Sequence, residues 1–60
     1  MKKTEARIGM KVHPLGRGDR ILYINEIGEK TAGVSSIKGG KSNYGVDYDR
    51  LIKFKNQDNN

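Results

Sequence analysis

The chain of 60 residues contains no cysteine and no tryptophan, and only one histidine, one proline and one phenylalanine. Without cysteine, the fold can use neither a disulfide bond nor a thiolate zinc site to supplement its core. The longest uninterrupted apolar run, residues 21–24, is far shorter than the about 20 residues that span a membrane. Residues 1–7 are partly basic, but no apolar segment follows them, so they are not a secretory signal. We therefore expect a cytoplasmic protein that does not associate with a membrane.

The length of the chain allows one small domain. A domain of this size buries only about 60% of the surface that its unfolded chain exposes. Hydrophobic residues make up 33% of the chain and charged residues 32%, which is lean for a globular domain but unlike a disordered chain. A core this small cannot hold itself together and also enclose a buried active site. We therefore expect a function carried by the surface, without enzymatic activity and without a cofactor.

Positive charge is the most prominent feature of the composition. The net charge is +5 and the sequence pI is about 9.8. The excess lies in residues 1–11, which carry +3, and in residues 29–46, which carry +2, whereas the rest of the chain is balanced. An excess of basic residues is typical of proteins that bind nucleic acid, although the same net charge also keeps a small domain in solution.

Glycine occurs eight times and divides the middle of the chain into short segments rich in Ile, Val, Tyr and Thr. Short β-branched segments between turn residues predict strands, and their spacing is typical of a small barrel or sandwich. Residues 47–50 are predicted to form one helical or 3₁₀ turn. The predicted strands are residues 11–13, 20–27, 30–37, 42–46 and 51–54.

The second predicted strand is apolar on both faces over residues 21–24. A strand that bends across a β-bulge would explain this, because it would then contribute to both halves of a curved sheet. The predicted core consists of Ile8, Val12, Ile21, Ile24, Ala32, Val34, Val46, Leu51 and either Ile52 or Phe54.

Both ends of the chain differ from its middle. Residues 1–7 are polar and show no hydrophobic period, which predicts a flexible basic arm. Residues 55–60, with the sequence KNQDNN, are predicted to form a disordered polar tail. The folded domain is therefore expected over residues 8–54.

The domain opens with the sequence IGMKV, at residues 8–12, and continues through a glycine-rich loop, LGRG, at residues 15–18. A tight turn at Gly28 and a Gly-Gly turn at residues 39–40 separate the next strands, and Leu51 precedes the end of the domain. This order resembles the SH3-like small β-barrels of the KOW and Tudor type. The resemblance implies an all-β fold, a single SH3-like barrel of about five short strands with one 3₁₀ turn before the last strand. Members of these families mostly bind RNA, DNA, ribosomes, polymerase or peptide segments.

Few residues are available for chemistry. His13 is the only histidine, and a general base would need an orienting carboxylate and a nucleophile beside it. Asp47 and Asp49 are interpreted as turn-forming carboxylates rather than as a metal pair. A Tudor-type aromatic cage around a methylated cation needs several aromatic faces, and the chain has three tyrosines and no tryptophan. We expect neither catalysis, nor a metal, nor such a cage.

Basic and aromatic residues accompany the predicted strands and suggest a binding surface. Two arginines flank the first loop, and two lysines flank the Gly-Gly turn. Tyr23 would face outward if Ile24 faces the core, and Tyr44 or Tyr48 would add a second ring, although Tyr44 is expected to be at least half buried. Single-strand binding proteins combine a positive groove with aromatic rings on which bases stack. The predicted nucleic-acid-binding residues are Arg17, Arg20, Tyr23, Lys38, Lys41 and Tyr48.

These features together predict a small non-enzymatic binding module. We expect a nucleic-acid-binding or transcription- or translation-associated accessory protein of a bacterium, plasmid or phage, present as a monomer or a weak homodimer. The alternative is an adaptor that docks a larger protein complex through an edge strand or through the first loop. A contiguous exposed apolar patch around Leu15, Leu22 or Tyr23 would favour the adaptor.

Overall fold

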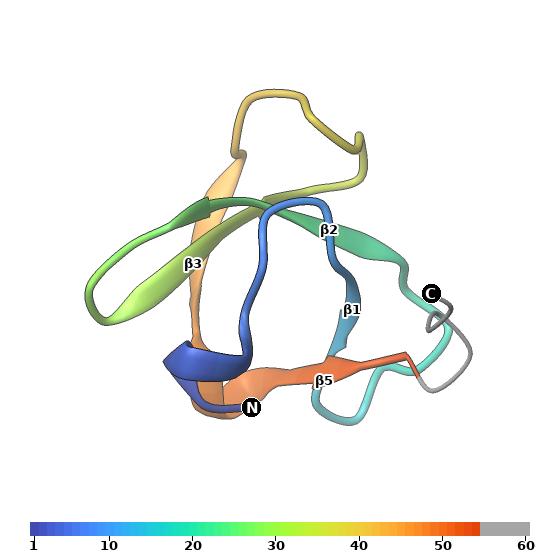
Figure 1. The fold of residues 1–60 in the computed structure, drawn as a ribbon. Coiled ribbons are helices and arrows are strands. Elements are labelled where there is room, and N and C mark those ends of the chain that lie inside the picture. Colours follow the sequence, from blue (N-terminus) through green and yellow to red (C-terminus); the bar gives the residue numbers. More distant parts are fainter. Residues whose placement is uncertain (55–60) are drawn as a thin grey trace.

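The computed structural model describes residues 1–54, and these residues form an almost entirely β structure. Five antiparallel strands make one open sheet in the order β4-β3-β2-β1-β5, which curves around the core with β4 and β5 at its edges (Figure 1). The predicted all-β class, with five short strands and one 3₁₀ turn before the last, is confirmed. The elements are η1 (Lys3–Glu5), β1 (Lys11–Pro14), β2 (Leu22–Ile27), β3 (Thr31–Ser35), β4 (Tyr44–Asp47), η2 (Tyr48–Arg50) and β5 (Leu51–Lys53).

Nothing in residues 1–54 forms a helix of the length and apolarity that crossing a membrane requires. The predicted polar tail, residues 55–60, lies outside the described residues.

Halfway along β2, the side chains that face the core change from even to odd positions. Leu22 and Ile24 are buried, and Tyr23 lies on the opposite face of the strand. The pairing with β3 then shifts register between Ile24 and Glu26, so that Asn25 is an extra residue in β2. After this bulge Ile27 packs against the core. The β-bulge, which was predicted from the apolar residues on both faces of this strand, is therefore present.

The core is built from eight buried side chains, and five of them belong to the predicted set. Ile8 and Ile21 were predicted to be buried, but 60% of Ile8 and 45% of Ile21 are exposed. Ile21 lies just before β2, whose first residue, Leu22, pairs with Val12 and takes the inward position instead. Val46, also predicted, packs against the core but is only partly buried. The buried hydrophobic residues among residues 1–54 are Ala6, Val12, Leu22, Ile24, Ala32, Val34, Tyr48 and Leu51.

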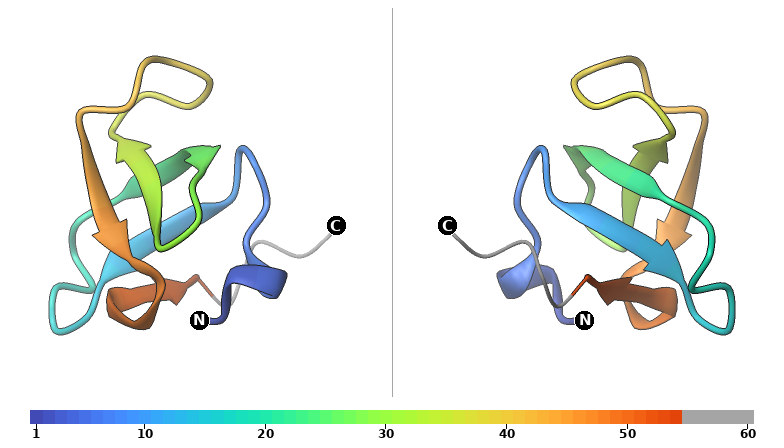
Figure 2. Two further views of the ribbon diagram at one scale, coloured as in Figure 1. Left: turned by 90° about the vertical axis from the view of Figure 1, so that its left-hand side faces the viewer. Right: turned by 90° about the vertical axis from the view of Figure 1, so that its right-hand side faces the viewer.

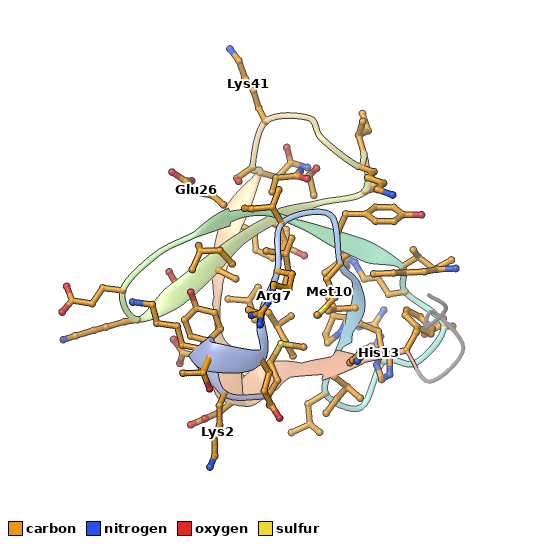
Figure 3. All side chains as sticks on the ribbon, in the orientation of Figure 1. Lys2, Arg7, Met10, His13, Glu26 and Lys41 are labelled. Carbon is orange, nitrogen blue, oxygen red and sulfur yellow. The ribbon has the colours of Figure 1, made fainter. Side chains whose placement is uncertain are left out.

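Residues 1–7, predicted to be a flexible arm, instead pack against the sheet. The nitrogen of Met1 donates hydrogen bonds of 2.9 Å to the carbonyl oxygens of Tyr48 and Leu51. Ala6 is 5% exposed and belongs to the core, and Met10 lies inside the curve of the sheet (Figure 3). Sequence reasoning missed these contacts because residues 1–7 are polar and show no hydrophobic period. The folded domain therefore includes the N-terminal segment.

Tyr48 connects η2 to the turn between β2 and β3. Its side chain is 6% exposed, and its hydroxyl donates a hydrogen bond of 2.5 Å to the carbonyl oxygen of Gly28. The turn itself is closed by a hydrogen bond of 3.0 Å from the nitrogen of Gly28 to the carbonyl oxygen of Thr31. A Cβ at Gly28 would lie 2.6 Å from that same oxygen, so no other residue fits without a shift of the backbone. The predicted tight turn at Gly28 therefore anchors η2 as well.

Candidate nucleic-acid interface

A groove of about 450 Å³ lies between the loop of residues 15–21, strand β4 and turn η2. Figure 2 shows that β4 runs toward this loop on the side of the molecule opposite the N-terminal segment. The volume lies within the range of about 300–1,000 Å³ that is usual for ligand pockets. The groove is lined by Pro14, Leu15, Arg17, Arg20, Tyr44, Gly45, Val46, Asp47 and Arg50.

Main-chain hydrogen bonds set the shape of the 15–21 loop. The nitrogen of Leu15 donates to the carbonyl oxygen of Arg50 over 2.8 Å, which ties the loop to η2. Within the loop, the nitrogen of Arg17 donates to Pro14 over 3.0 Å, and that of Arg20 donates to Arg17 over 3.1 Å. The loop also needs one glycine, Gly16, because the backbone there has a φ of +80°. These main-chain bonds shape the loop and do not involve the side chains of Arg17 and Arg20, which lie at the rim of the groove.

Three arginine side chains surround the groove, and all three are available to a ligand. Within residues 1–54, the guanidinium groups of Arg17, Arg20 and Arg50 form no hydrogen bond and no ion pair. Arg7 differs, because its guanidinium group donates to the carbonyl oxygens of Thr4 and Ala6 at 2.8 and 2.9 Å. The lining contains one carboxylate, that of Asp47, so the groove carries a net charge of +2.

Apolar and aromatic surface lies beside these charges. Tyr44 is 42% exposed, which agrees with the expectation that it is at least half buried, and it lines the groove together with Leu15, which is 63% exposed. Tyr44 stands opposite Val34 in the pairing of β4 with β3, so the sheet fixes the backbone position from which its ring projects. The groove therefore offers cations and an exposed aromatic ring to the same ligand.

The structure separates the six residues that the sequence predicted as one site. Only Arg17 and Arg20 line the groove. Lys38 and Lys41 lie on the loop of residues 36–43 at the far end of the molecule, where Lys41 points away from the body (Figure 3). Tyr23 lies on the outer face of β2, and its role is considered below.

Tyr48 lies in the core and not on the surface, so its ring gives no base a face to stack on. Its place in the groove is taken by Tyr44, which was considered for the same role, and by Arg50, which sequence reasoning missed. Both differences arise in η2, which buries the side chain of Tyr48 and leaves that of Arg50 exposed. Nothing in the sequence marks Arg50, at the end of the predicted turn over residues 47–50, as a residue of the groove.

The 36–43 loop is held in place by the side chain of Asn25, the extra residue of the β2 bulge. Its Nδ2 donates to Ser35 Oγ over 2.8 Å and to the carbonyl oxygen of Ile37 over 3.0 Å. Its Oδ1 accepts a hydrogen bond of 2.9 Å from the nitrogen of Gly39. The bulge therefore sets the position of the loop that carries Lys38 and Lys41.

Replacing Asn25 with alanine should release this loop. The variant loses three side-chain hydrogen bonds, and at roughly 0.5–1.5 kcal/mol for each bond we expect a loss of about 2 kcal/mol of stability. Urea denaturation measures the loss, and amide hydrogen exchange at Gly39 should become faster than in the unaltered protein. The matched control is Asn43→Ala in the same loop, which removes an exposed side chain and should change stability by less than about 0.5 kcal/mol. Equal effects of the two substitutions would contradict the anchoring role of Asn25.

Among residues 1–54, no three His, Asp or Glu side chains gather closely enough to hold a metal ion. No family model matches the chain, and neither the curated proteins nor the solved structures contain a match to it. The function is therefore inferred from the side chains of this chain alone.

Proposed function

We propose that the protein is a nucleic-acid-binding module that holds a single strand in the groove between the 15–21 loop and β4. The observation that carries this proposal is the set of three uncommitted arginines around the exposed ring of Tyr44. Guanidinium groups bind phosphate with two parallel hydrogen bonds, and an aromatic ring accepts a base of any sequence by stacking. The groove thus combines the two kinds of contact that non-specific single-strand binding requires.

Tyr44 favours a single strand over a duplex. In a duplex, both faces of each base are stacked on its neighbours, so no face remains for the ring of Tyr44. The phosphates of a duplex still attract the arginines, which predicts weaker binding of duplex than of single strand. The module then recognises the chemistry of an unpaired strand more than its sequence.

The order of the elements supports the resemblance to SH3-like barrels of the KOW and Tudor type. In support are the sheet order β4-β3-β2-β1-β5, the bulge that bends β2, and the 3₁₀ turn η2 directly before β5. Domains of this shape mostly act by binding, which agrees with a groove that is open at the surface. These features support the proposal that the protein is a small non-enzymatic accessory module of transcription or translation.

Replacing Arg17, Arg20 and Arg50 together with alanine should weaken single-strand binding about tenfold or more at about 50 mM salt. The slope of log affinity against log salt should also become shallower by about 2, because each phosphate contact on a single strand contributes about 0.7. Fluorescence anisotropy with labelled oligothymidylate at about 50 and about 200 mM salt measures both quantities, and a duplex of the same length is titrated in parallel.

The matched control removes the same charge outside the groove, by replacing the exposed Lys2, Lys3 and Lys30 with alanine. It should weaken binding much less than the arginine variant does. An equal effect of both variants would mean that net charge alone attracts the strand and that the groove is not the site. Binding weaker than about 1 μM at low salt would rule out the nucleic-acid function itself.

The edge strand favours a second candidate, an adaptor that adds a strand of a partner protein to β4. β4 ends the sheet, so the main-chain groups on its side away from β3 face no strand within residues 1–54. An extended acidic segment could pair there and place its carboxylates beside the arginines. The exposed apolar patch that would favour an adaptor is absent at Leu22, which is 2% exposed, although Leu15 is exposed beside the groove. Such a partner would slow amide exchange along β4, whereas a nucleic acid adds no main-chain pairing.

A further inference from the structure

The outer surface of β1, β2 and β5 presents a row of three side chains across the strands. Lys11 stands opposite Tyr23 in the pairing of β1 with β2, and the nitrogen of Phe54 donates a hydrogen bond of 3.4 Å to the carbonyl oxygen of Lys11. Since Val12 and Leu22 are buried, the residues next to them, Lys11 and Tyr23, project from the opposite face of the sheet. Lys11 therefore lies between two aromatic residues, and its Nζ is 5.2 Å from the centre of the Phe54 ring.

His13 extends this row along β1. Its ring meets the ring of Phe54 edge to face, with the ring centres 4.8 Å apart and an angle of 66° between their planes. Its Nδ1 is 3.0 Å from the carbonyl oxygen of Pro14, and within residues 1–54 its Nε2 has no protein partner. Figure 3 shows His13 beside β1 on the side where β5 lies. We call the surface formed by Lys11, His13, Tyr23 and Phe54 the Tyr23 face.

The Tyr23 face and the groove share the 15–21 loop as a common border. Gly18 of this loop lies against His13, because a Cβ at Gly18 would be 3.9 Å from the Cε1 atom of His13. Arg20 of the same loop lines the groove, and Ile21, which is 45% exposed, leads from it into β2. A strand that leaves the groove past this loop therefore comes directly onto the Tyr23 face.

We propose that the Tyr23 face is a second contact surface for the same single strand, on which one base stacks against the ring of Tyr23 and the adjoining phosphate contacts Lys11 and His13. The inference rests on the proposed function, since the strand must first occupy the groove. The chemistry of the face favours this occupant, because within residues 1–54 it combines an aromatic ring with a lysine and an imidazole, and none of its four side chains is a carboxylate.

Two lengths of oligothymidylate test this surface, because only the longer one can reach from the groove to it. Lengths of about 4 and about 12 nucleotides lie near the ends of the range that single-strand domains cover. Replacing Tyr23 with leucine should weaken binding of the longer strand about tenfold and leave binding of the shorter strand unchanged. Tyr23→Phe keeps the ring, so it should bind both lengths as the unaltered protein does. Fluorescence anisotropy measures all six affinities.

Nuclear magnetic resonance on the unaltered protein gives a measurement that does not depend on the stability of any variant. The longer strand should shift the amide signals of Lys11, His13 and Tyr23, and the shorter strand should shift only signals of the groove. Unchanged signals on the Tyr23 face with the longer strand would overturn the inference, as would full affinity of Tyr23→Leu for it.

The outcomes separate the two proposals. If the arginine variant loses binding of both lengths while Tyr23→Leu binds normally, the groove is the site and the Tyr23 face is not. If neither oligonucleotide binds the unaltered protein at low salt, the proposed function and this inference fail together.

Discussion

Replacing Tyr48 with alanine should lower the free energy of unfolding by about 3–5 kcal/mol, as removal of a large buried aromatic side chain does. A domain of this length has only about 3–9 kcal/mol of stability in total, so much of the variant should be unfolded at room temperature. The ring of Tyr48 is 6% exposed and belongs to the core, and its hydroxyl holds the turn at Gly28. Urea denaturation followed by far-ultraviolet circular dichroism measures the change.

Two further tyrosine substitutions test this role of Tyr48. Tyr48→Phe keeps the ring and loses the hydrogen bond to Gly28, so it should cost about 1 kcal/mol. Tyr44→Ala removes the same side chain from a position that is 42% exposed, and it should cost clearly less than Tyr48→Ala. If Tyr44→Ala and Tyr48→Ala were equally destabilising, Tyr48 would not be the core residue that its burial indicates.

Replacing Ile24 with alanine should have the second largest effect, a loss of about 2–5 kcal/mol of stability. Ile24 is fully buried, and its backbone exchanges hydrogen bonds with Gly9 and Met10, which join the N-terminal segment to β2. Ile24→Val removes a single methylene group and should cost only about 0.5–1.5 kcal/mol. The same urea denaturation measures both variants.

The matched control for Ile24 is Ile8→Ala, the same change at a position that is 60% exposed. It should alter stability by less than about 0.5 kcal/mol. This comparison also tests the difference between the predicted core, which included Ile8, and the observed one. A large loss of stability in Ile8→Ala would mean that the predicted core was right at this position.

The strands and the turn before the last strand could be predicted because their signals are local. Glycine at the turns and β-branched residues between them placed the first strand at residues 11–13, and the structure has it at Lys11–Pro14. The predicted turn at residues 47–50 contains η2, Tyr48–Arg50. Alternation also identified Ala32 and Val34 as inward residues, because the bulge lies in β2 and β3 itself alternates regularly along its pairing with β4.

The errors concern contacts between segments that are distant in the sequence. Ile21 and Leu22 are both apolar, and only the pairing of Leu22 with Val12 decides which of them is buried. The burial of Tyr48 could not be predicted locally, because its hydroxyl bonds to the carbonyl group of Gly28, which is 20 residues away. The groove was predicted in part for the same reason, since the arginines of the first loop meet Tyr44 and Arg50 only when the sheet curves.

The two loops that carry basic side chains differ in how many of their interactions depend on particular side chains. Main-chain bonds shape the 15–21 loop, so its side chains can be exchanged while the loop keeps its form, provided that Gly16 remains. The 36–43 loop depends in addition on the side chains of Asn25 and Ser35, which lie in β2 and β3 and bond to Ile37 and Gly39. If the groove binds as proposed, its ligand preference can therefore change through single substitutions there, without a second change elsewhere that restores the fold.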